Sequence, residues 1–261
     1  MGPVPRRLSG DWQDADPRCP VEGADPVEPP SGAALTVVMV CLTVVTGVLD
    51  AVSFLTLGHV FTATQTGNLL FLGFGISGQG GLPVAATVVS LGAFLAGAVT
   101  GARLESALAT RRRPWFPVAL LVEAALLAGA AAACWGSGPA RGLTAGQRYA
   151  VIALMAVAMG VRNVTSMRVA APDLTTTVET RAMTALVSGS VLGGDRLLGY
   201  GSHAVPRRLS SVGAMLLGGL LGAWLIGLGT RTPLVVLLAA VTVAATALLV
   251  PGLAHGRNAD G

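Results

Sequence analysis

Six apolar runs, each about as long as a bilayer is thick, constrain this chain more than any other feature of its sequence. A transmembrane helix needs roughly 20 mainly apolar residues, and runs near that length lie at 33–57, 83–104, 115–136, 147–169, 210–229 and 232–250. Hydrophobic residues make up 52% of the chain and charged residues only 11%, which is too few charges to cover a soluble domain. The runs predict an all-α, polytopic transmembrane bundle, and argue against a soluble enzyme or a nucleic-acid-binding domain.

Two further segments begin with polar residues and only then turn apolar. Residues 62–78 start with ThrAlaThrGlnThrGlyAsn, and residues 174–194 start with LeuThrThrThrValGluThrArg. A helix facing lipid would not tolerate these polar groups, whereas a broken helix buried among other helices would. We therefore predict two broken or re-entrant half-helices beside the six spans.

The arginines give the predicted topology. If the two polar-led segments turn back instead of spanning, most arginines of the connecting segments fall on one side, as the positive-inside rule requires. This arrangement places both termini in the cytoplasm. The predicted organisation is a disordered cytoplasmic tail, a first repeat, a second repeat and a short cytoplasmic tail, at 1–32, 33–136, 147–252 and 253–261.

The repeat is visible in matched residues. The first and fourth runs share a pattern at one constant offset, in which Gly47, Asp50 and Ser53 match Gly160, Asn163 and Ser166. The polar segments continue it after one inserted residue, with Thr62, Gln65 and Thr66 matching Thr176, Glu179 and Thr180. Three crossings per half would make the repeat inverted. Broken helices at matching positions of two halves point to a transporter site, although a duplication kept for packing is the alternative.

The candidate solute- or ion-binding residues are the polar side chains of these segments: Asp50, Ser53, Thr62, Gln65, Thr66, Asn68, Asn163, Thr176 and Glu179. A carboxylate inside a membrane helix costs about 2.5–3.5 kcal/mol on insertion scales, so it faces the bundle interior or a partner. Asp50 either belongs to the site or orients the first half-helix by hydrogen bonding. The Thr and Asn residues at 62–68 equally suit a helix cap.

Buried charges should also find each other. Arg162 lies in the fourth run, and either Asp50 or Glu123 could be its ion-pair partner. The sequence leaves this choice open.

Three glycine pairs have the spacing that lets membrane helices approach closely: Gly97 and Gly101, Gly189 and Gly193, and Gly218 and Gly222. We interpret them as packing within the bundle, with the face of a homo-oligomer as the alternative. The three cysteines and three histidines are scattered without metal-ligand spacing, so we predict no enzyme, no metal and no cofactor. The predicted surroundings are the lipid bilayer, with no nucleic-acid partner.

A family resemblance supports the membrane class. GlyValLeuAspAlaValSer at 47–53 followed by ThrGlyAsn at 66–68, together with ProAspLeuThrThrThr at 172–177, resembles the signature of the YoaK-like bacterial membrane proteins. Arg181 departs from this pattern, where relatives tend to have Gly. The resemblance implies a location in the bacterial inner membrane and carries no substrate with it.

The leading functional hypothesis is a small-solute or ion transporter. Proton coupling would use Asp50 or Glu179. The alternative is a non-transporting membrane protein that assembles with partners.

Overall fold

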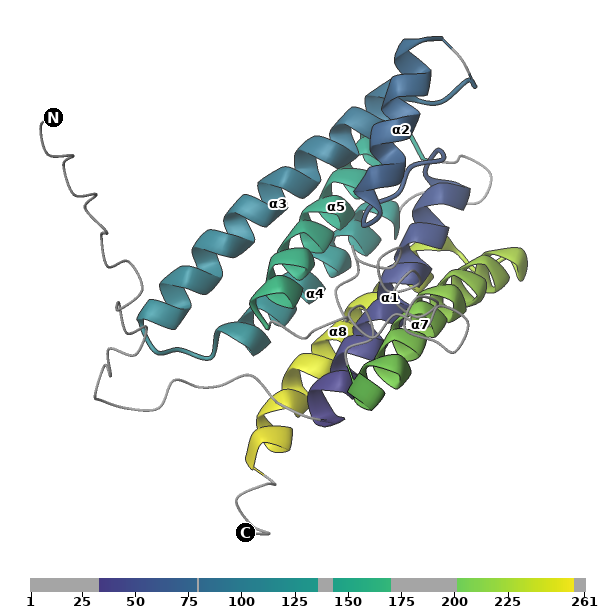
Figure 1. The fold of residues 1–261 in the computed structure, drawn as a ribbon. Helices are drawn as coiled ribbons and strands as arrows, with labels where there is room; N and C mark the ends of the chain where they lie inside the picture. Colours follow the sequence, from purple (N-terminus) through teal and green to yellow (C-terminus); the bar gives the residue numbers. More distant parts are fainter. Residues whose placement is uncertain (1–32, 79, 136–142, 170–200, 256–261) are drawn as a thin grey trace, which may run out of the picture.

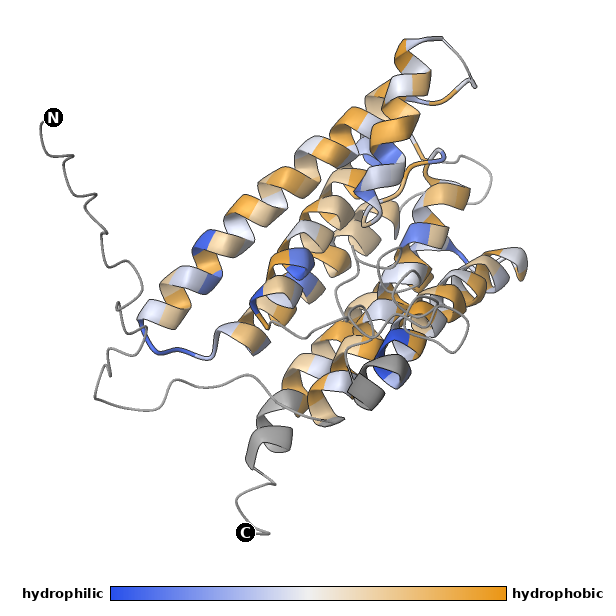
Figure 2. Cartoon of the chain, viewed as in Figure 1, coloured by the Kyte–Doolittle hydropathy of each residue, from blue (hydrophilic) through white to orange (hydrophobic). Residues whose placement is uncertain are grey.

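The computed structural model describes residues 33–78, 80–135, 143–169 and 201–255 (Figure 1). These residues form α1 (Ala33–Thr56), α2 (Gln65–Ile76), α3 (Val84–Thr110), α4 (Trp115–Trp135), α5 (Ala145–Arg168), α7 (Gly201–Gly227) and α8 (Thr232–His255). All except α2 are long and apolar enough to cross a membrane, and hydrophobic residues cover most of their length in Figure 2. The prediction of a helical transmembrane bundle is confirmed, and the chain is a multi-pass membrane protein.

Three spans extend several residues beyond the apolar runs that predicted them, and one of them is α8, which continues past residue 250 to His255. The run 83–104 stops too early, because α3 continues through Arg103 and Glu105 to Thr110. The run 210–229 begins too late, because α7 already includes Pro206 and the arginines that follow it. Membrane helices commonly extend beyond the hydrocarbon layer at their charged ends, where long charged side chains reach the interface.

The half-helix α2 follows the first polar segment. Its 12 residues rise only about 18 Å at 1.5 Å per residue, less than the roughly 30 Å of the hydrocarbon core. It lies at the end of the bundle where α1 ends and α3 begins (Figure 1). The first predicted half-helix is therefore present, whereas the second, at 174–194, lies outside the described residues.

The helix directions follow an inverted order. The start of α1, the end of α8 and the connection from α3 to α4 lie at one end of the bundle, and the turn from α7 to α8 lies at the other (Figure 1). The helix α5 begins at the end opposite to the start of α1 (Figure 1). The first helices of the two halves therefore run in opposite directions, and the two halves have opposite orientations.

The helices pair across the two halves. The most extensive contacts are those of α3 with α5 and of α1 with α7, and α4 packs between α5 and α8. Exchanging the halves turns α1 into α5, α3 into α7 and α4 into α8, so the α1–α7 pair becomes the α5–α3 pair. The packing of the described helices thus follows the repeat seen in the sequence.

The two pairs are joined by equivalent glycine contacts. A Cβ atom at Gly97 would lie 2.2 Å from the carbonyl oxygen of Val157, and one at Gly218 would lie 2.2 Å from that of Val44. Val44 and Val157 are separated by the same offset as Asp50 and Asn163. These distances leave no room for a side chain, so glycine is required where the backbones meet.

The partner glycines show the same symmetry. A Cβ atom at Gly160 would lie 2.2 Å from the carbonyl oxygen of Phe94, and one at Gly47 would lie 2.6 Å from that of Met215. The GxxxG spacings on α3 and α7 therefore serve packing inside the bundle, as predicted. Gly189 and Gly193 lie outside the described residues.

Candidate functional site

The polar segment after α1 doubles back toward the middle of the bundle. The chain turns at Gly58 and His59, whose φ angles are 110° and 57°, in the left-handed region that non-glycine residues seldom adopt. The ring of Phe61 then stacks on that of Phe54 with centroids 5.1 Å apart. This turn brings residues 62–64 beside Asp50, which lies more than one helical turn before the end of α1.

Asp50 holds the start of the half-helix. Its side chain is 4% exposed, and all five hydrogen bonds that it receives from the described residues come from the segment before α2. Oδ1 accepts from the backbone N–H groups of Thr62 and Ala63 at 2.9 and 2.8 Å and from Thr62 Oγ1 at 3.3 Å. Oδ2 accepts from the N–H of Thr64 at 3.1 Å and from its Oγ1 at 2.6 Å.

In this arrangement three consecutive backbone N–H groups just before α2 converge on one carboxylate. Successive backbone N–H groups in a turn form a concave site that favours a negative group. The carboxylate of Asp50 supplies that group from within the chain. Of the two roles predicted for Asp50, the geometry matches the orienting one.

A second set of contacts joins α2 to α3. Asn68 is fully buried. Its Oδ1 accepts a hydrogen bond from the N–H of Phe61 at 2.9 Å. Its Nδ2 donates to the carbonyl of Phe61 at 2.6 Å and to Gln65 Oε1 at 2.8 Å. Ser90 of α3 donates to the same carbonyl at 2.7 Å, and Gln65 Nε2 donates to Ser90 Oγ at 3.3 Å. The re-entrant segment is therefore attached to α1 through Asp50 and to α3 through Ser90.

Ser90 was not predicted as part of this cluster. A signal for it exists in the repeat, because Ser90 and Ser211 of α7 are related by the same offset as Gly97 and Gly218. Both serines are buried. A serine at the same position of two matching apolar helices indicates a hydroxyl that binds a backbone group of a neighbouring segment. Here the hydroxyl of Ser90 donates to the carbonyl of Phe61.

The remaining predicted residues are more dispersed. Ser53 is buried, but its hydroxyl donates to the carbonyl of Asp50 at 3.1 Å within α1. Thr66 is exposed, as are Leu69 and Leu70 of the same helix. Asn163 is half-buried on α5, with Nδ2 3.9 Å from Met167 Sδ. Thr176 and Glu179 lie outside the described residues.

A buried ion pair lies between α1, α4 and α5. The guanidinium of Arg162 binds Glu123 through two hydrogen bonds, one from Nε to Oε2 at 2.7 Å and one from Nη2 to Oε1. Nη1 donates to the carbonyl of Leu42 in α1 at 2.7 Å. Both charged side chains are about 1% exposed. Of the two partners left open by the sequence, Arg162 pairs with Glu123.

A third polar group, which was not predicted from the sequence, lies at the C-terminal end of α5, beyond Arg162. Glu105 of α3 accepts hydrogen bonds from the hydroxyl of Thr165 and from Arg168 Nε, the latter at 2.9 Å. The guanidinium of Arg168 lies 5.6 Å from the ring centroid of Trp115, within the range of a cation–π interaction. The predicted apolar run ends at residue 104, one residue before Glu105, and therefore predicts this carboxylate outside the membrane, whereas α3 continues through it.

The described residues contain no group of three or more His, Cys, Asp and Glu side chains placed to hold a metal ion. Their polar groups instead bind backbone N–H groups, arginines and hydroxyls. This arrangement can position a half-helix and hold helices together.

The comparisons with known proteins agree with this architecture. A similar protein is the UPF0700 transmembrane protein YoaK of Bacillus subtilis (strain 168), which is 38% identical over 61 residues, covering 23% of this chain and 26% of that relative. The match thus spans about a quarter of the relative's length. No solved structure matches the chain. The family described as "Protein of unknown function (DUF1275)" matches residues 38–249, which reach from α1 to α8, and the chain therefore belongs to this family of membrane proteins.

Proposed function

We propose that this protein transports a small polar solute or an ion. The observation that carries the proposal is the inverted repeat, in which α1 meets α7 and α3 meets α5 through equivalent glycine contacts. Inverted repeats that contain an interrupted helix are a common architecture of secondary transporters, with the substrate site where the repeats meet. A non-transporting assembly loses support, because the described GxxxG glycines contact neighbouring helices of the same chain.

The proposed moving parts are the two helix pairs. Among the described helices, the α1–α7 pair meets the α3–α5 pair directly only where α1 touches α5, and α4 and α8 connect them elsewhere. Close backbone contact makes each pair a stiff unit, so relative motion is easiest between the pairs. Such motion would open one end of the bundle while closing the other.

The re-entrant segment is the proposed wall of the solute path. It contacts Asp50 in one pair and Ser90 in the other, so motion between the pairs must move it relative to at least one of them. Gln65 of this segment and Asn163 of α5 are the described polar residues that we propose to line the path. Thr176 and Glu179 remain candidates from the repeat pattern.

Coupling to protons is assigned to Glu179 in preference to Asp50. The carboxylate of Asp50 accepts five hydrogen bonds that a neutral carboxyl group could not all retain. Asp50 would position the segment, and Glu179 would exchange the proton.

The proposed location is the bacterial inner membrane with both termini in the cytoplasm. The arginine cluster at 111–113 lies at the same end of the bundle as the start of α1 and the end of α8 (Figure 1). Clustered arginines favour the cytoplasmic side.

Reconstitution tests the proposal. The purified full chain would be placed in liposomes and offered a panel of inorganic ions, amino acids, sugars and weak acids, with and without a pH gradient. We expect at least one solute to enter faster than into protein-free liposomes, and Asn163→Leu to abolish that flux without lowering the melting temperature. Thr100→Val, on the exposed side of α3, is the matched control and should retain flux. Equal rates for every solute with and without protein would refute transport of these classes.

A further inference from the structure

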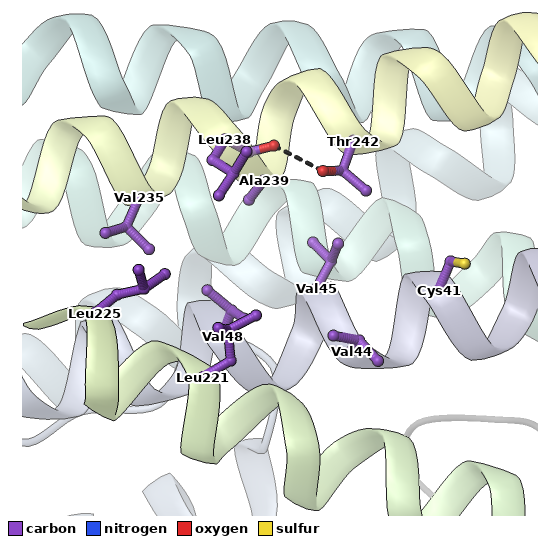
Figure 3. Close-up of a pocket in the computed structure, with 10 residues that line it drawn as sticks. All are labelled: Cys41, Val44, Val45, Val48, Leu221, Leu225, Val235, Leu238, Ala239 and Thr242. Carbon is purple, nitrogen blue, oxygen red and sulfur yellow. Dashed lines mark hydrogen bonds between the residues drawn. The ribbon is translucent and has the colours of Figure 1, made fainter.

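A long apolar groove runs between α1, α7 and α8 (Figure 3). Its volume is about 200 Å³, and the lining residues are Cys41, Val44, Val45, Val48, Leu221, Leu225, Val235, Leu238, Ala239 and Thr242. The floor is buried, with Val45, Val235 and Ala239 at most 5% exposed, whereas the rim residues Leu221 and Leu238 are 40% and 54% exposed. The groove is therefore open along its side.

The groove lies at the middle of the membrane-spanning helices. Residues 41–48 bracket the midpoint of the span Ala34–Thr56, and residues 235–242 bracket that of Thr232–Leu249. The hydrocarbon core is roughly 30 Å thick, so this depth is about 15 Å from either headgroup layer. Only an apolar molecule can reach a side-opening groove there at low cost.

The lining matches such an occupant. The hydroxyl of Thr242 donates to the carbonyl of Leu238 at 2.9 Å, as the dashed line in Figure 3 shows, so its hydrogen bond is made within α8. Among the described residues, the other lining side chains are aliphatic apart from the Cys41 thiol. An apolar cavity of roughly 150 Å³ holds a benzene molecule, so this groove has room for a stretch of hydrocarbon chain.

The other half of the repeat has a larger side chain at the corresponding place. The repeat position of Cys41 in α5 is Leu154. Leu154 packs against the core, with Cδ1 3.9 Å from the place of a Cβ atom at Gly129 of α4. The α4–α5 contact is accordingly more extensive than the equivalent α1–α8 contact. A small residue at position 41 leaves open a space that a leucine occupies in the other half.

We propose that the groove between α1, α7 and α8 binds one acyl chain of a membrane phospholipid. The surrounding hydrocarbon supplies this ligand, and the chain would fill the space between α1 and α8 that Cys41 leaves open. This proposal does not depend on transport.

Photolabelling in nanodiscs tests it. The full chain would be placed in phosphatidylethanolamine and phosphatidylglycerol containing a phosphatidylcholine whose acyl chain carries a diazirine near its end, and adducts would be located by mass spectrometry. Exposed Leu248 of α8, at 71% exposure, reports the bulk lipid. We expect adducts on the buried floor residues Val45 or Ala239 at a yield comparable with that on Leu248.

Two variants make the result specific. Cys41→Leu should fill the groove and lower the floor adducts severalfold while leaving the Leu248 adduct unchanged. Leu154→Ala, which opens the equivalent place in the other half, should leave the floor adducts unchanged. Labelled Leu248 with an unlabelled floor, or floor adducts that persist in Cys41→Leu, would overturn the proposal. Cross-linking of two chains through Cys41 by a bifunctional maleimide would also overturn it, because a second copy would then be the occupant.

Discussion

Replacing Glu123 by glutamine removes the negative charge that faces the buried guanidinium of Arg162. The substitution keeps the shape of the side chain and one oxygen that can accept a hydrogen bond. Arg162 would still reach the carbonyl of Leu42 and the hydroxyl of Thr46, but neither carries a formal charge. At 1% exposure, the arginine has no path by which its charge could reach water or a lipid headgroup without unpacking α5.

The size of the effect follows from this burial. An unpaired arginine at the centre of a membrane helix costs about 2.5–3.5 kcal/mol on insertion scales, and breaking a buried ion pair on one side costs about 3–5 kcal/mol. The overlap of these ranges gives a loss of about 3 kcal/mol in the free energy of unfolding. At 1.36 kcal/mol per factor of ten, that loss lowers the ratio of folded to unfolded protein about a hundredfold.

Glu105→Gln is the matched control, because it makes the same chemical change at a pair whose arginine is partly exposed. Glu105 is buried, but Arg168 is 33% exposed on its side chain and can extend toward the interface once it is unpaired, so the loss of stability should be smaller than that of Glu123→Gln. Unfolding by sodium dodecyl sulfate in mixed micelles, followed by circular dichroism, compares the variants.

Removing both charges provides a further check on the same pair. Glu123→Leu combined with Arg162→Met should recover most of the lost stability, because apolar replacement of a buried ion pair is often neutral or stabilising. If Glu123→Gln costs no more than Glu105→Gln, the reasoning from burial is wrong.

Three further results are expected. Asp50→Asn turns an N–H donor toward the N–H donors of residues 62–64 and should lower the free energy of unfolding by about 1–3 kcal/mol. In this variant, a cysteine introduced at the buried position 62 should change from protected to reactive toward a methanethiosulfonate reagent. Continued protection of that cysteine would contradict the anchoring role of Asp50. Gly97→Ala and Gly218→Ala should each destabilise the protein by about 1–3 kcal/mol, because the added methyl group overpacks the helix contact. Gly92→Ala and Gly219→Ala are the controls: a Cβ atom there would have nothing within 4 Å, so these changes should be neutral or stabilising by up to about 1 kcal/mol. Unequal losses at positions 97 and 218 would argue against equivalent helix pairs. With the native cysteines replaced, Thr110→Cys and Leu228→Cys should be labelled by an impermeant maleimide from opposite sides of the membrane, and labelling from one side would exclude six spans.

The membrane-spanning helices and the first half-helix could be predicted from the sequence because their signals are local. A run of about 20 apolar residues is long enough to cross the bilayer whatever its neighbours are, and the polar backbone and side chains of ThrAlaThrGlnThrGlyAsn need hydrogen-bond partners inside the protein. The repeat was also visible, since Gly47 and Asp50 have counterparts in Gly160 and Asn163. The GxxxG spacing predicted close packing for the same reason, because only a missing side chain allows backbones to meet.

The partners of the polar side chains depended on the tertiary structure. The sequence offers both Asp50 and Glu123 as partners for Arg162, and the packing of α4 against α5 brings Glu123 to it. Asp50 meets three consecutive N–H groups because the turn at Gly58 and His59 folds residues 62–64 back beside α1. Glu105 lies at a helix end that looked exposed, and it is buried because α5 brings Thr165 and Arg168 against it. Hydrophobic length acts along one helix, whereas a hydrogen bond needs two groups within about 3 Å of each other, and that distance is set only when the helices pack.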